Sequence, residues 1–248
     1  MSQGYGRVAL VSAGSRGIGA ATVRRLAADG WDISFCHDGD ELSALEVEKA
    51  ASELGARVLA VRADVTDGDE VTSWAYQVEE EFGPVAAVVS CAGITRDQPL
   101  ALLCDADWRA VVDTSLDGVF HLCRATLFSM MRRQYGRIVM ISSVFGVYAH
   151  APWGGYPAAR PGIVGFTKAL ATMTRQFGIC ANAIAPAVTV ADTTAIVPES
   201  TRNTLTETII LRRFGRAAEV ADRVAFLVSD EACDLTGRVL EAPAGLLP

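Results

Sequence analysis

The chain has 248 residues and a mass of 26.3 kDa, which is enough for one large α/β domain or two small ones. Half of its residues are hydrophobic, so we expect a sizeable buried core. The net charge of −7 argues against a nucleic-acid partner or an anionic membrane surface, because both select basic faces. No segment approaches the roughly 18 unbroken apolar residues of a membrane span.

The first residues lead through a short apolar run directly into a glycine-rich loop, which is not the pattern of a signal peptide. The six cysteines are scattered without the spacing of a metal site or a disulfide framework. They are Cys36, Cys91, Cys104, Cys123, Cys180 and Cys233. We therefore expect a cytoplasmic protein with reduced thiols and no bound metal.

Short apolar runs alternate with helical patterns along the whole chain. The predicted strands cover residues 7–11, 32–36, 57–61, 85–90, 138–141, 180–185 and 238–241. The predicted helices cover residues 20–30, 41–54, 67–82, a long segment ending near 131, and 217–229. This alternation predicts an α/β fold in three layers, with one doubly wound parallel sheet and a single domain over residues 1–248.

A glycine-rich loop lies between the first predicted strand and its helix. It reads Ser12, Ala13, Gly14, Ser15, Arg16, Gly17, Ile18 and Gly19. Glycines let the backbone approach a pyrophosphate, whose negative charge is stabilised at a helix N-terminus. Strand, loop and helix in this order are typical of a Rossmann-type dinucleotide-binding fold.

A second cluster of functional residue types follows the strand at 138–141, which ends in Ser142 and Ser143. Tyr156 comes thirteen positions after Ser143, and Arg160 follows Tyr156 by one helical turn. Open α/β sheets bind ligands at the carboxyl ends of their strands. We interpret Ser143 as holding a carbonyl oxygen and Tyr156 as protonating it while a cofactor supplies hydride. The nearby cation favours the phenolate form of the tyrosine.

With these residues assembled, the chain resembles the classical short-chain dehydrogenase/reductases over nearly its whole length. Within that family it is most similar to the 3-oxoacyl-[acyl-carrier-protein] reductases. The resemblance rests on the glycine loop, on Asp64-Val65, on Ala92-Gly93, on Ser143 and Tyr156, on the run from Asn182 to Pro186, and on Thr236-Gly237. It implies the cofactor-binding residues Ser12, Gly14, Ser15, Arg16, Gly17, Ile18, Gly19, His37, Asp64, Val65, Ala92, Gly93, Tyr156, Arg160 and Pro186. The implied catalytic residues are Ser143, Tyr156, Arg160 and Ser115.

Several positions depart from the family pattern. Ala13 stands where the first loop glycine is expected, and Gly14 beside it keeps the turn flexible. Ser90-Cys91 replaces a pair of asparagines, Ala187 replaces a glycine, and residues 242–245 replace a V-D-G-G run. Two changes touch the catalytic tetrad, because Ser115 replaces asparagine and Arg160 replaces lysine.

The two tetrad changes alter what the site can do. Arg160 can bind the ribose hydroxyls of a nicotinamide cofactor, but it does not release a proton and is a poor relay. Ser115 is short and reaches a relay through one extra water. Pro157 and Pro161 flank the Arg160 turn, and a proline disfavours helical angles in the residue before it. We therefore predict that the helix begins only near Pro161, with Arg160 displaced from the position of the family lysine.

The resemblance also bears on the cofactor. Arg16 and His37 stand where members that use NADP place groups around the 2′-phosphate, so we expect NADPH (NADP+), although Asp38 follows immediately. Asp64 is expected to bind the adenine amine. Read on its own, Asp64 would be an aspartate of a turn or a helix cap.

The first functional hypothesis is an NADPH-dependent ketoreductase that reduces a 3-oxoacyl thioester, of fatty-acid or polyketide type, to its 3-hydroxyacyl form. An arginine cluster at 132, 133, 137 and 175 suits an acidic acyl carrier protein, and residues 186–214 are a predicted substrate lid. The alternative is a non-catalytic or weakly active subunit, or a nucleotide-sensing partner of a homologous reductase. In either case the resemblance implies a homodimer or homotetramer built on two long helices, possibly including a homologous subunit.

Overall fold

The computed structural model describes residues 7–96, 98–99, 101–144, 156–187, 189–190, 206–207, 209 and 211–242. Seven parallel strands form one sheet in the order β3-β2-β1-β4-β5-β6-β9. Their bounds are β1 (Val8–Val11), β2 (Asp32–His37), β3 (Val58–Arg62), β4 (Val85–Ser90), β5 (Gly136–Ile141), β6 (Ile179–Pro186) and β9 (Val239–Ala242). The predicted doubly wound parallel sheet is confirmed.

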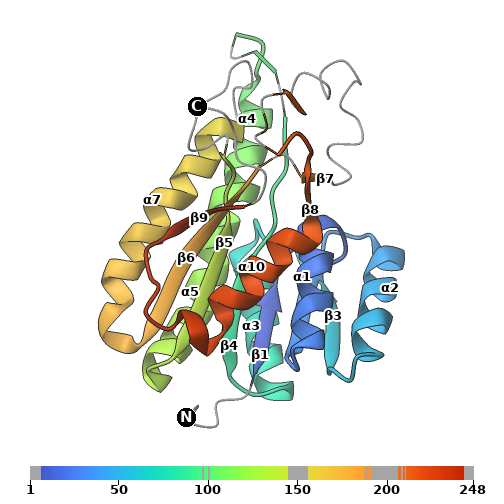
Figure 1. Ribbon diagram of the computed structural model, residues 1–248, viewed down its shortest axis with the longest axis vertical. Helices are drawn as coiled ribbons and strands as arrows, with labels where there is room; N and C mark the ends of the chain where they lie inside the picture. The colour runs from blue at the N-terminus through green and yellow to red at the C-terminus, as the bar shows by residue number, and fades with distance from the viewer. Residues whose placement is uncertain are drawn as a thin grey trace.

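Helices cover both faces of the sheet (Figure 1). One face carries α1 (Gly17–Ala28), α2 (Glu41–Ser52) and α10 (Ala217–Val228), and the other carries α3 (Gly68–Glu81), α5 (Gly118–Arg133) and α7 (Tyr156–Thr174). Val11 and Phe35 pack into the first layer, while Leu10 and Met140 pack into the second. The central strands β1, β4 and β5 are buried at every position, which explains why most of their residues are apolar.

The predicted long helix ending near 131 consists of three consecutive segments. They are α4 (Asp105–Val112), a π-helical turn (Asp113–Asp117) and α5, which ends where Gln134 adopts a left-handed backbone with φ 58°. The π-helical turn places Ser115 in the buried interior. Helical periodicity continues across all three segments, so the sequence pattern does not mark this turn.

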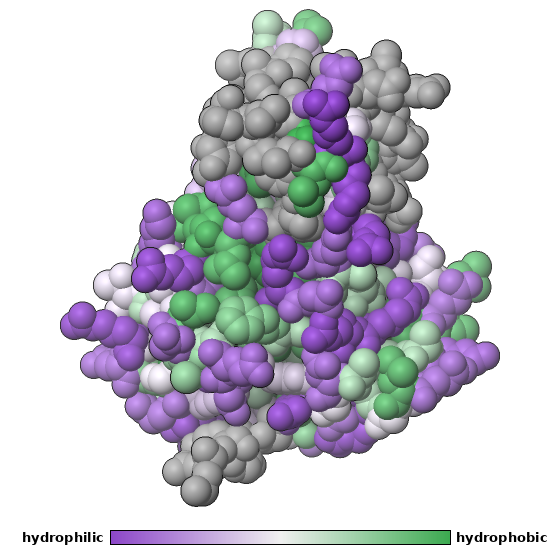
Figure 2. Space-filling view, viewed as in Figure 1, coloured by the Kyte–Doolittle hydropathy of each residue, from purple (hydrophilic) through white to green (hydrophobic). Residues whose placement is uncertain are grey.

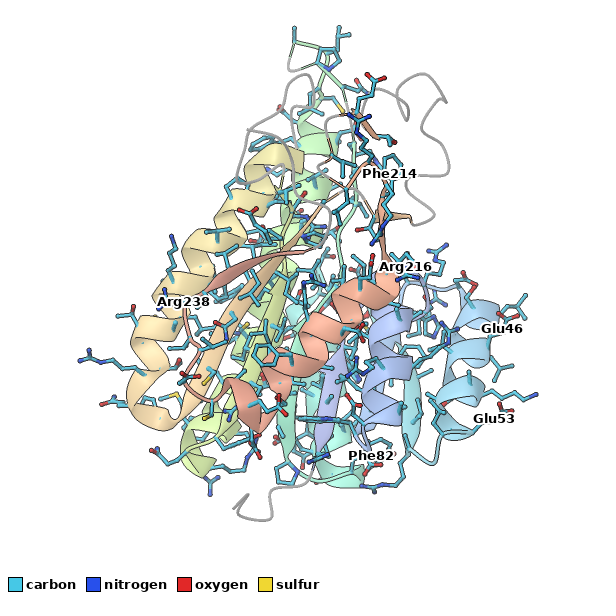
Figure 3. All side chains as sticks on the ribbon, viewed as in Figure 1. Glu46, Glu53, Phe82, Phe214, Arg216 and Arg238 are labelled. Atoms are coloured by element: carbon cyan, nitrogen blue, oxygen red, sulfur yellow. The ribbon has the colours of Figure 1, made fainter. Side chains whose placement is uncertain are left out.

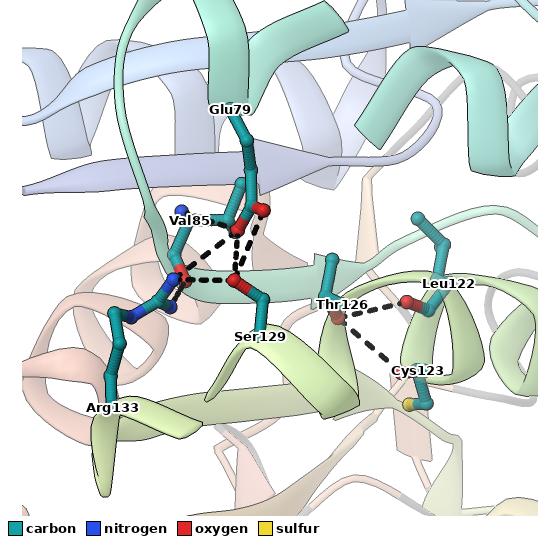
Figure 4. A network of polar contacts seen from close by, with 7 residues as sticks. All are labelled: Glu79, Val85, Leu122, Cys123, Thr126, Ser129 and Arg133. Atoms are coloured by element: carbon teal, nitrogen blue, oxygen red, sulfur yellow. Dashed lines mark hydrogen bonds and ion pairs between the residues drawn. The ribbon is translucent and has the colours of Figure 1, made fainter. Parts of the chain in front are cut away.

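Polar groups fix α3 and α5 to the start of β4. Glu79 of α3 accepts a hydrogen bond from Ser129 of α5 at 2.7 Å, and Arg133 donates to both of them (Figure 4). Arg133 also donates to the carbonyl of Val85. This network holds the two helices against each other at the amino ends of the strands, away from the predicted site.

Short elements lie at the opposite, carboxyl end of the sheet. β7 (Thr189–Val190) pairs in parallel with β8 (Gly215–Arg216), directly before α10. Figure 3 places Phe214 and Arg216 above the N-terminus of α10, and Phe82 at the other end of the molecule. Phe214 packs with Val144 and Ile209 in a small apolar cluster. Much of the predicted lid, including residues 191–205, lies outside the described residues.

The surface is of mixed character. On the face in Figure 2, hydrophilic side chains predominate and apolar atoms gather beside α10, which exposes Phe226. Within the described residues, no helix is both long and apolar enough to cross a membrane. The same part of the chain contains no cluster of three or more His, Cys, Asp or Glu that could hold a metal ion.

Candidate active site

The strand order reverses between β1 and β4, and a hydroxyl ties the ends of these two strands together. Ser12 Oγ accepts hydrogen bonds from the backbone N–H groups of Cys91 and Ala92, both at 3.0 Å. Gly14 donates its backbone N–H to the carbonyl of Cys36 at the end of β2. The glycine loop and the Ala92-Gly93 segment therefore meet at the switch point, where open α/β sheets bind ligands.

Two residues of the glycine loop adopt left-handed backbones, Ala13 with φ 51° and Gly17 with φ 55°. Gly14 does not, so the expectation that Gly14 gives the turn its freedom is wrong. Gly14 is needed for a different reason, because a Cβ there would collide with the Phe35 side chain. A Cβ at Gly19 would collide with the Ala13 carbonyl, so the loop folds tightly onto the first turn of α1.

The N-terminus of α1 is suited to an anion. Its N-cap residue Arg16 makes no side-chain capping bond, and no acidic side chain lies in the first turn. The exposed end of the helix dipole and the loop amides around Gly17 are the groups that hold a pyrophosphate in a dinucleotide site. These residues fit a nicotinamide dinucleotide, with Ser12, Ser15 and Ile18 completing the loop.

The predicted start of the helix near Pro161 is wrong. α7 begins at Tyr156 and contains both prolines, so Arg160 lies one turn after Tyr156, as lysine does in the family pattern. Pro157 occupies the first turn, where a helix needs no N–H donor. Pro161 forfeits one helical hydrogen bond, and contacts of Arg160 with the sheet hold the turn in place.

Arg160 is a buried cation, with 6% of its surface exposed, at the carboxyl ends of β4 and β5. Its Nη1 donates to the carbonyl of Ile141, and its own carbonyl accepts from Ser142 Oγ at 2.9 Å. Ser143 is also buried and directly follows Ser142. Ser143 is thus the next residue after the contact between Ser142 and Arg160, while the Tyr156 side chain lies outside the described residues.

Gly93 and Ser115 complete this group. A Cβ added at Gly93 would collide with Arg160 Nη2 and would lie 3.3 Å from Ser115 Oγ. Ser115 Oγ is fully buried and has no hydrogen-bond partner among the described residues. A buried polar atom of this kind has unused hydrogen-bonding capacity, and π-helical turns are frequent at functional sites. Ser115 is therefore placed where a tetrad residue is expected.

Cys91 lies in the same region, and its thiol has low reactivity. Burial raises the pKa of its thiol to about 12, and the nearby charge of Arg160 opposes this shift only in part. The thiol is therefore protonated and a poor nucleophile at neutral pH. Cys91 replaces a family asparagine without introducing a reactive sulfur.

The adenine end of the predicted site lies at the ends of β2 and β3. Asp64 Oδ1 accepts from the backbone and the hydroxyl of Thr66, while Oδ2 makes no hydrogen bond within the described part of the chain. Val65 is buried against Gly118. The turn function of Asp64 is thus present, and one oxygen is still able to accept from an adenine amine.

The region predicted to face a 2′-phosphate, around Arg16 and His37, contains charges of both signs. Arg16 lies 3.8 Å from Asp38 and 3.5 Å from Asp40, and His37 Nδ1 accepts from the backbone of Gly39. Arg62 stands directly opposite His37 across the β2–β3 pair. Sequence reasoning missed Arg62, although a cation ending the third predicted strand was a usable signal.

Ser142 was also missed as a functional candidate, because a serine beside a stronger candidate has no distinguishing pattern.

Pro186 ends β6 opposite Ala242 of β9, at the same edge of the sheet as the other predicted residues. Most of the predicted site residues lie at the carboxyl ends of the strands. They are the glycine loop, Ala92-Gly93, Ser115, Ser143, Arg160 and Pro186.

The comparisons with known proteins agree with this geometry. A family model described as enoyl-(acyl carrier protein) reductase matches residues 12–246. The 3-oxoacyl-[acyl-carrier-protein] reductase of Escherichia coli K12 is 36% identical over 241 residues, which cover 97% of each chain. The same-named enzyme of Staphylococcus epidermidis is 34% identical over 238 residues, covering 96% of this chain and 98% of its own. The parallel sheet, the loop at its switch point and these matches together show that the chain belongs to the short-chain dehydrogenase/reductase family of oxidoreductases.

Proposed function

We propose that this protein is an NADPH-dependent reductase that converts a 3-oxoacyl thioester, of fatty-acid or polyketide type, to the 3-hydroxyacyl form. The observation that carries the proposal is the contact between β5 and α7. Ser142 and Ile141 bond Arg160 there, so the segment that continues into Ser143 is joined to the helix that carries Tyr156 and Arg160, which supports these three residues as the catalytic group. The named activity of the relatives supports the same substrate class.

The proposed roles follow from the chemistry of each side chain. The bound cofactor supplies hydride to the carbonyl carbon. Ser143 donates a hydrogen bond to the carbonyl oxygen, and Tyr156 donates the proton that this oxygen gains. Arg160 binds the ribose hydroxyls and favours the phenolate form of Tyr156 through its charge. Ser115 offers its buried hydroxyl to a water that links this group to solvent.

The preference for NADPH is proposed from Arg16, with His37 and Arg62 beside it. Asp38 and Asp40 lie within ion-pair distance of Arg16, so a 2′-phosphate competes with these two carboxylates for this cation. A doubly charged phosphate attracts a guanidinium more strongly than a singly charged carboxylate does, because its charge is higher.

Removal of the Arg16 charge tests this preference. NADPH should bind more tightly than NADH to the parent protein, and Arg16→Ala should reduce the difference by about ten- to hundredfold, since a charge-assisted hydrogen bond contributes roughly 1.5–3 kcal/mol. Fluorescence titration of both cofactors measures the difference. Arg96→Ala is the control, because Arg96 is an equally exposed arginine that pairs with Asp107 elsewhere. Equal affinities of the parent for the two cofactors would contradict the preference.

An acyl carrier protein is the proposed bearer of the thioester. The predicted arginine cluster is smaller than expected, because Arg137 is buried over the Tyr135 ring and near Asp230, while Arg133 is held in the Glu79 network. Arg132 and Arg175 remain exposed at the amino end of the sheet. Because this end of the sheet is opposite the predicted site, the arginine cluster does not support carrier docking, and the carrier is proposed from the named activity of the relatives.

A homodimer or homotetramer is proposed from the helices of the second layer. α5 exposes Phe120 and Phe128, and α7 exposes Met173, with 72% of Phe128 and 68% of Met173 accessible. Large apolar side chains of this kind are typical of an interface between protein chains. Light scattering of the parent beside Phe128→Glu measures the assembly, and an unchanged mass in the variant would contradict this interface.

The experiment that tests the function is NADPH consumption by the purified protein with an acetoacetyl thioester, on a small-molecule carrier and on acyl carrier protein. We expect turnover on both carriers, and a lower KM with the carrier protein. An NADPH titration accompanies the assay. Binding without turnover on either carrier would contradict the proposal and would support the non-catalytic, nucleotide-sensing subunit.

A further inference from the structure

Ser142 makes contacts that no catalytic or cofactor-binding role requires. It is 2% exposed and lies just beyond the end of β5. Its backbone N–H donates to the carbonyl of Ile184 at 2.7 Å, which extends the pairing with β6. Its hydroxyl points to the other side and donates to the carbonyl of Arg160 at 2.9 Å. Ser142 therefore links the sheet to the first turns of α7.

Ile141, the residue before Ser142, binds the side chain of Arg160. The Ile141 carbonyl accepts from Arg160 Nη1, so two consecutive residues of one strand hold the backbone and the side chain of the same arginine. Gly93 encloses the guanidinium from the side of β4, because a Cβ at Gly93 would collide with Nη2. Arg160 is therefore bonded to the Ile141–Ser142 segment both through its backbone carbonyl and through its side chain.

The helix needs this external support because of Pro161. Proline has no N–H, so the carbonyl of Pro157 has no helical donor four residues later, and the turn that begins at Tyr156 is joined to the rest of α7 by one hydrogen bond fewer. The Ser142 hydroxyl bonds the carbonyl at the end of that turn. This bond does not satisfy the Pro157 carbonyl, but it ties the same turn to the sheet where its connection to the rest of α7 is weakened.

We infer that Ser142 is a positioning residue for the reduction: its hydroxyl fixes the helical turn that carries Tyr156 and Arg160 relative to Ser143, the next residue along the strand. The inference rests on the proposed function for its catalytic consequence. Its structural consequence, a restrained first turn of α7, stands without it. Ser142 itself touches neither substrate nor cofactor in this role.

The test compares Ser142→Ala with a matched control, Thr174→Val. Thr174 is also buried, and its hydroxyl donates to the carbonyl of Leu170 within α7, so the control removes a similar bond that does not reach the sheet. Hydrogen–deuterium exchange is followed in peptides covering residues 156–164, and kcat and KM are measured with NADPH and an acetoacetyl thioester. We expect Ser142→Ala to exchange about two- to tenfold faster in this turn. We also expect its kcat to fall about tenfold at nearly constant KM.

Ser142→Thr retains the hydroxyl and should restore both values. If threonine does not fit the buried site and the protein does not fold, the comparison of Ser142→Ala with Thr174→Val decides alone. Unchanged exchange at residues 156–164 in Ser142→Ala would overturn the inference, and so would equal changes in the control. A parent protein without turnover would refute the proposed function, while the exchange experiment would still decide the role of Ser142.

Discussion

At the scale of single residues, Ala13 carries a backbone conformation that suits glycine. Its φ of 51° lies in the left-handed region, which costs an L-residue about 1–2 kcal/mol. Glycine would remove this cost and would lose about 0.4–1 kcal/mol through a more flexible unfolded chain. We therefore expect Ala13→Gly to raise the free energy of unfolding by about 0.5–1 kcal/mol, measured by urea denaturation.

Gly14→Ala is the control for Ala13→Gly. It adds a Cβ at the neighbouring position, where this atom would collide with the Phe35 side chain, so it should destabilise the protein. A lower free energy of unfolding in Ala13→Gly would show that the left-handed backbone is not strained. The sequence revealed that a family glycine was absent here, but the φ of the loop depends on how it folds against β2 and α1.

Arg160 and Ser115 allow a test of whether the tetrad is adapted or decayed. Arg160 donates to Ile141 with one nitrogen and faces Gly93 with another, which a single ammonium cannot reproduce. We expect Arg160→Lys to lower kcat about tenfold or more, because hydrogen bonds from a charged group contribute roughly 1.5–3 kcal/mol. The double variant Arg160→Lys with Ser115→Asn should remain slower than the parent.

Arg160 and Ser115 both lie beside Gly93, so the effects of their substitutions on kcat should be non-additive in a double-mutant cycle. A double variant clearly faster than the parent would indicate a decayed site. Ser143 and Arg160 stay predictions from their spacing, and Ser115 stays a prediction from the family resemblance. The support from Ser142 could not be predicted, because it depends on a hydroxyl-to-carbonyl contact between residues far apart in the chain.

At the scale of elements, α7 shows where local preference gives way to tertiary contacts. Pro157 and Pro161 predict a late helix start, but packing against the sheet holds the helix from Tyr156 onward. The π-helical turn at Ser115 could not be predicted either, because the spacing of apolar residues does not reveal its extra residue. Strands buried on both faces were the easiest elements to predict, because a short, nearly continuous apolar run is typical of a strand in a parallel sheet covered on both faces.

The start of α10 provides a pH prediction. Hydrogen bonds from the Arg213 side chain and the Arg216 backbone lower the pKa of Glu219 from 4.5 to about 2. Because the pKa is lower in the folded chain, the Glu219 carboxylate stabilises the fold above pH 4.5, and this contribution is lost as the pH falls toward 2.

Glu219→Gln should therefore lose less stability than the parent when denaturation is measured at decreasing pH between neutrality and pH 2. Glu46→Gln serves as the control, since Glu46 points away from α2 (Figure 3) and its carboxylate makes no hydrogen bond within the described residues. Identical acid profiles for Glu219→Gln and the parent would show that the Arg213 contact does not stabilise the start of α10.

At the scale of the whole molecule, the order of strands and helices follows from their alternation along the chain. Right-handed crossovers leave few alternatives for such a pattern, and the switch point between β1 and β4 then fixes where a ligand binds. The charge balance around Arg16 and His37 could not be predicted in the same way. It depends on Asp38 and Asp40, which lie beside Arg16, and on Arg62, which the β2–β3 register places opposite His37.

The proposed mechanism makes one central demand: the proton that the carbonyl oxygen gains comes from Tyr156. Turnover of an acetoacetyl thioester by Tyr156→Phe, read beside an NADPH binding titration, measures this. Phenylalanine keeps the ring and removes the donor, so we expect an unchanged Kd for NADPH and a kcat lower by about 10²–10⁴-fold, the usual contribution of general acid catalysis. Turnover by Tyr156→Phe at the rate of the parent would contradict the assignment of this site.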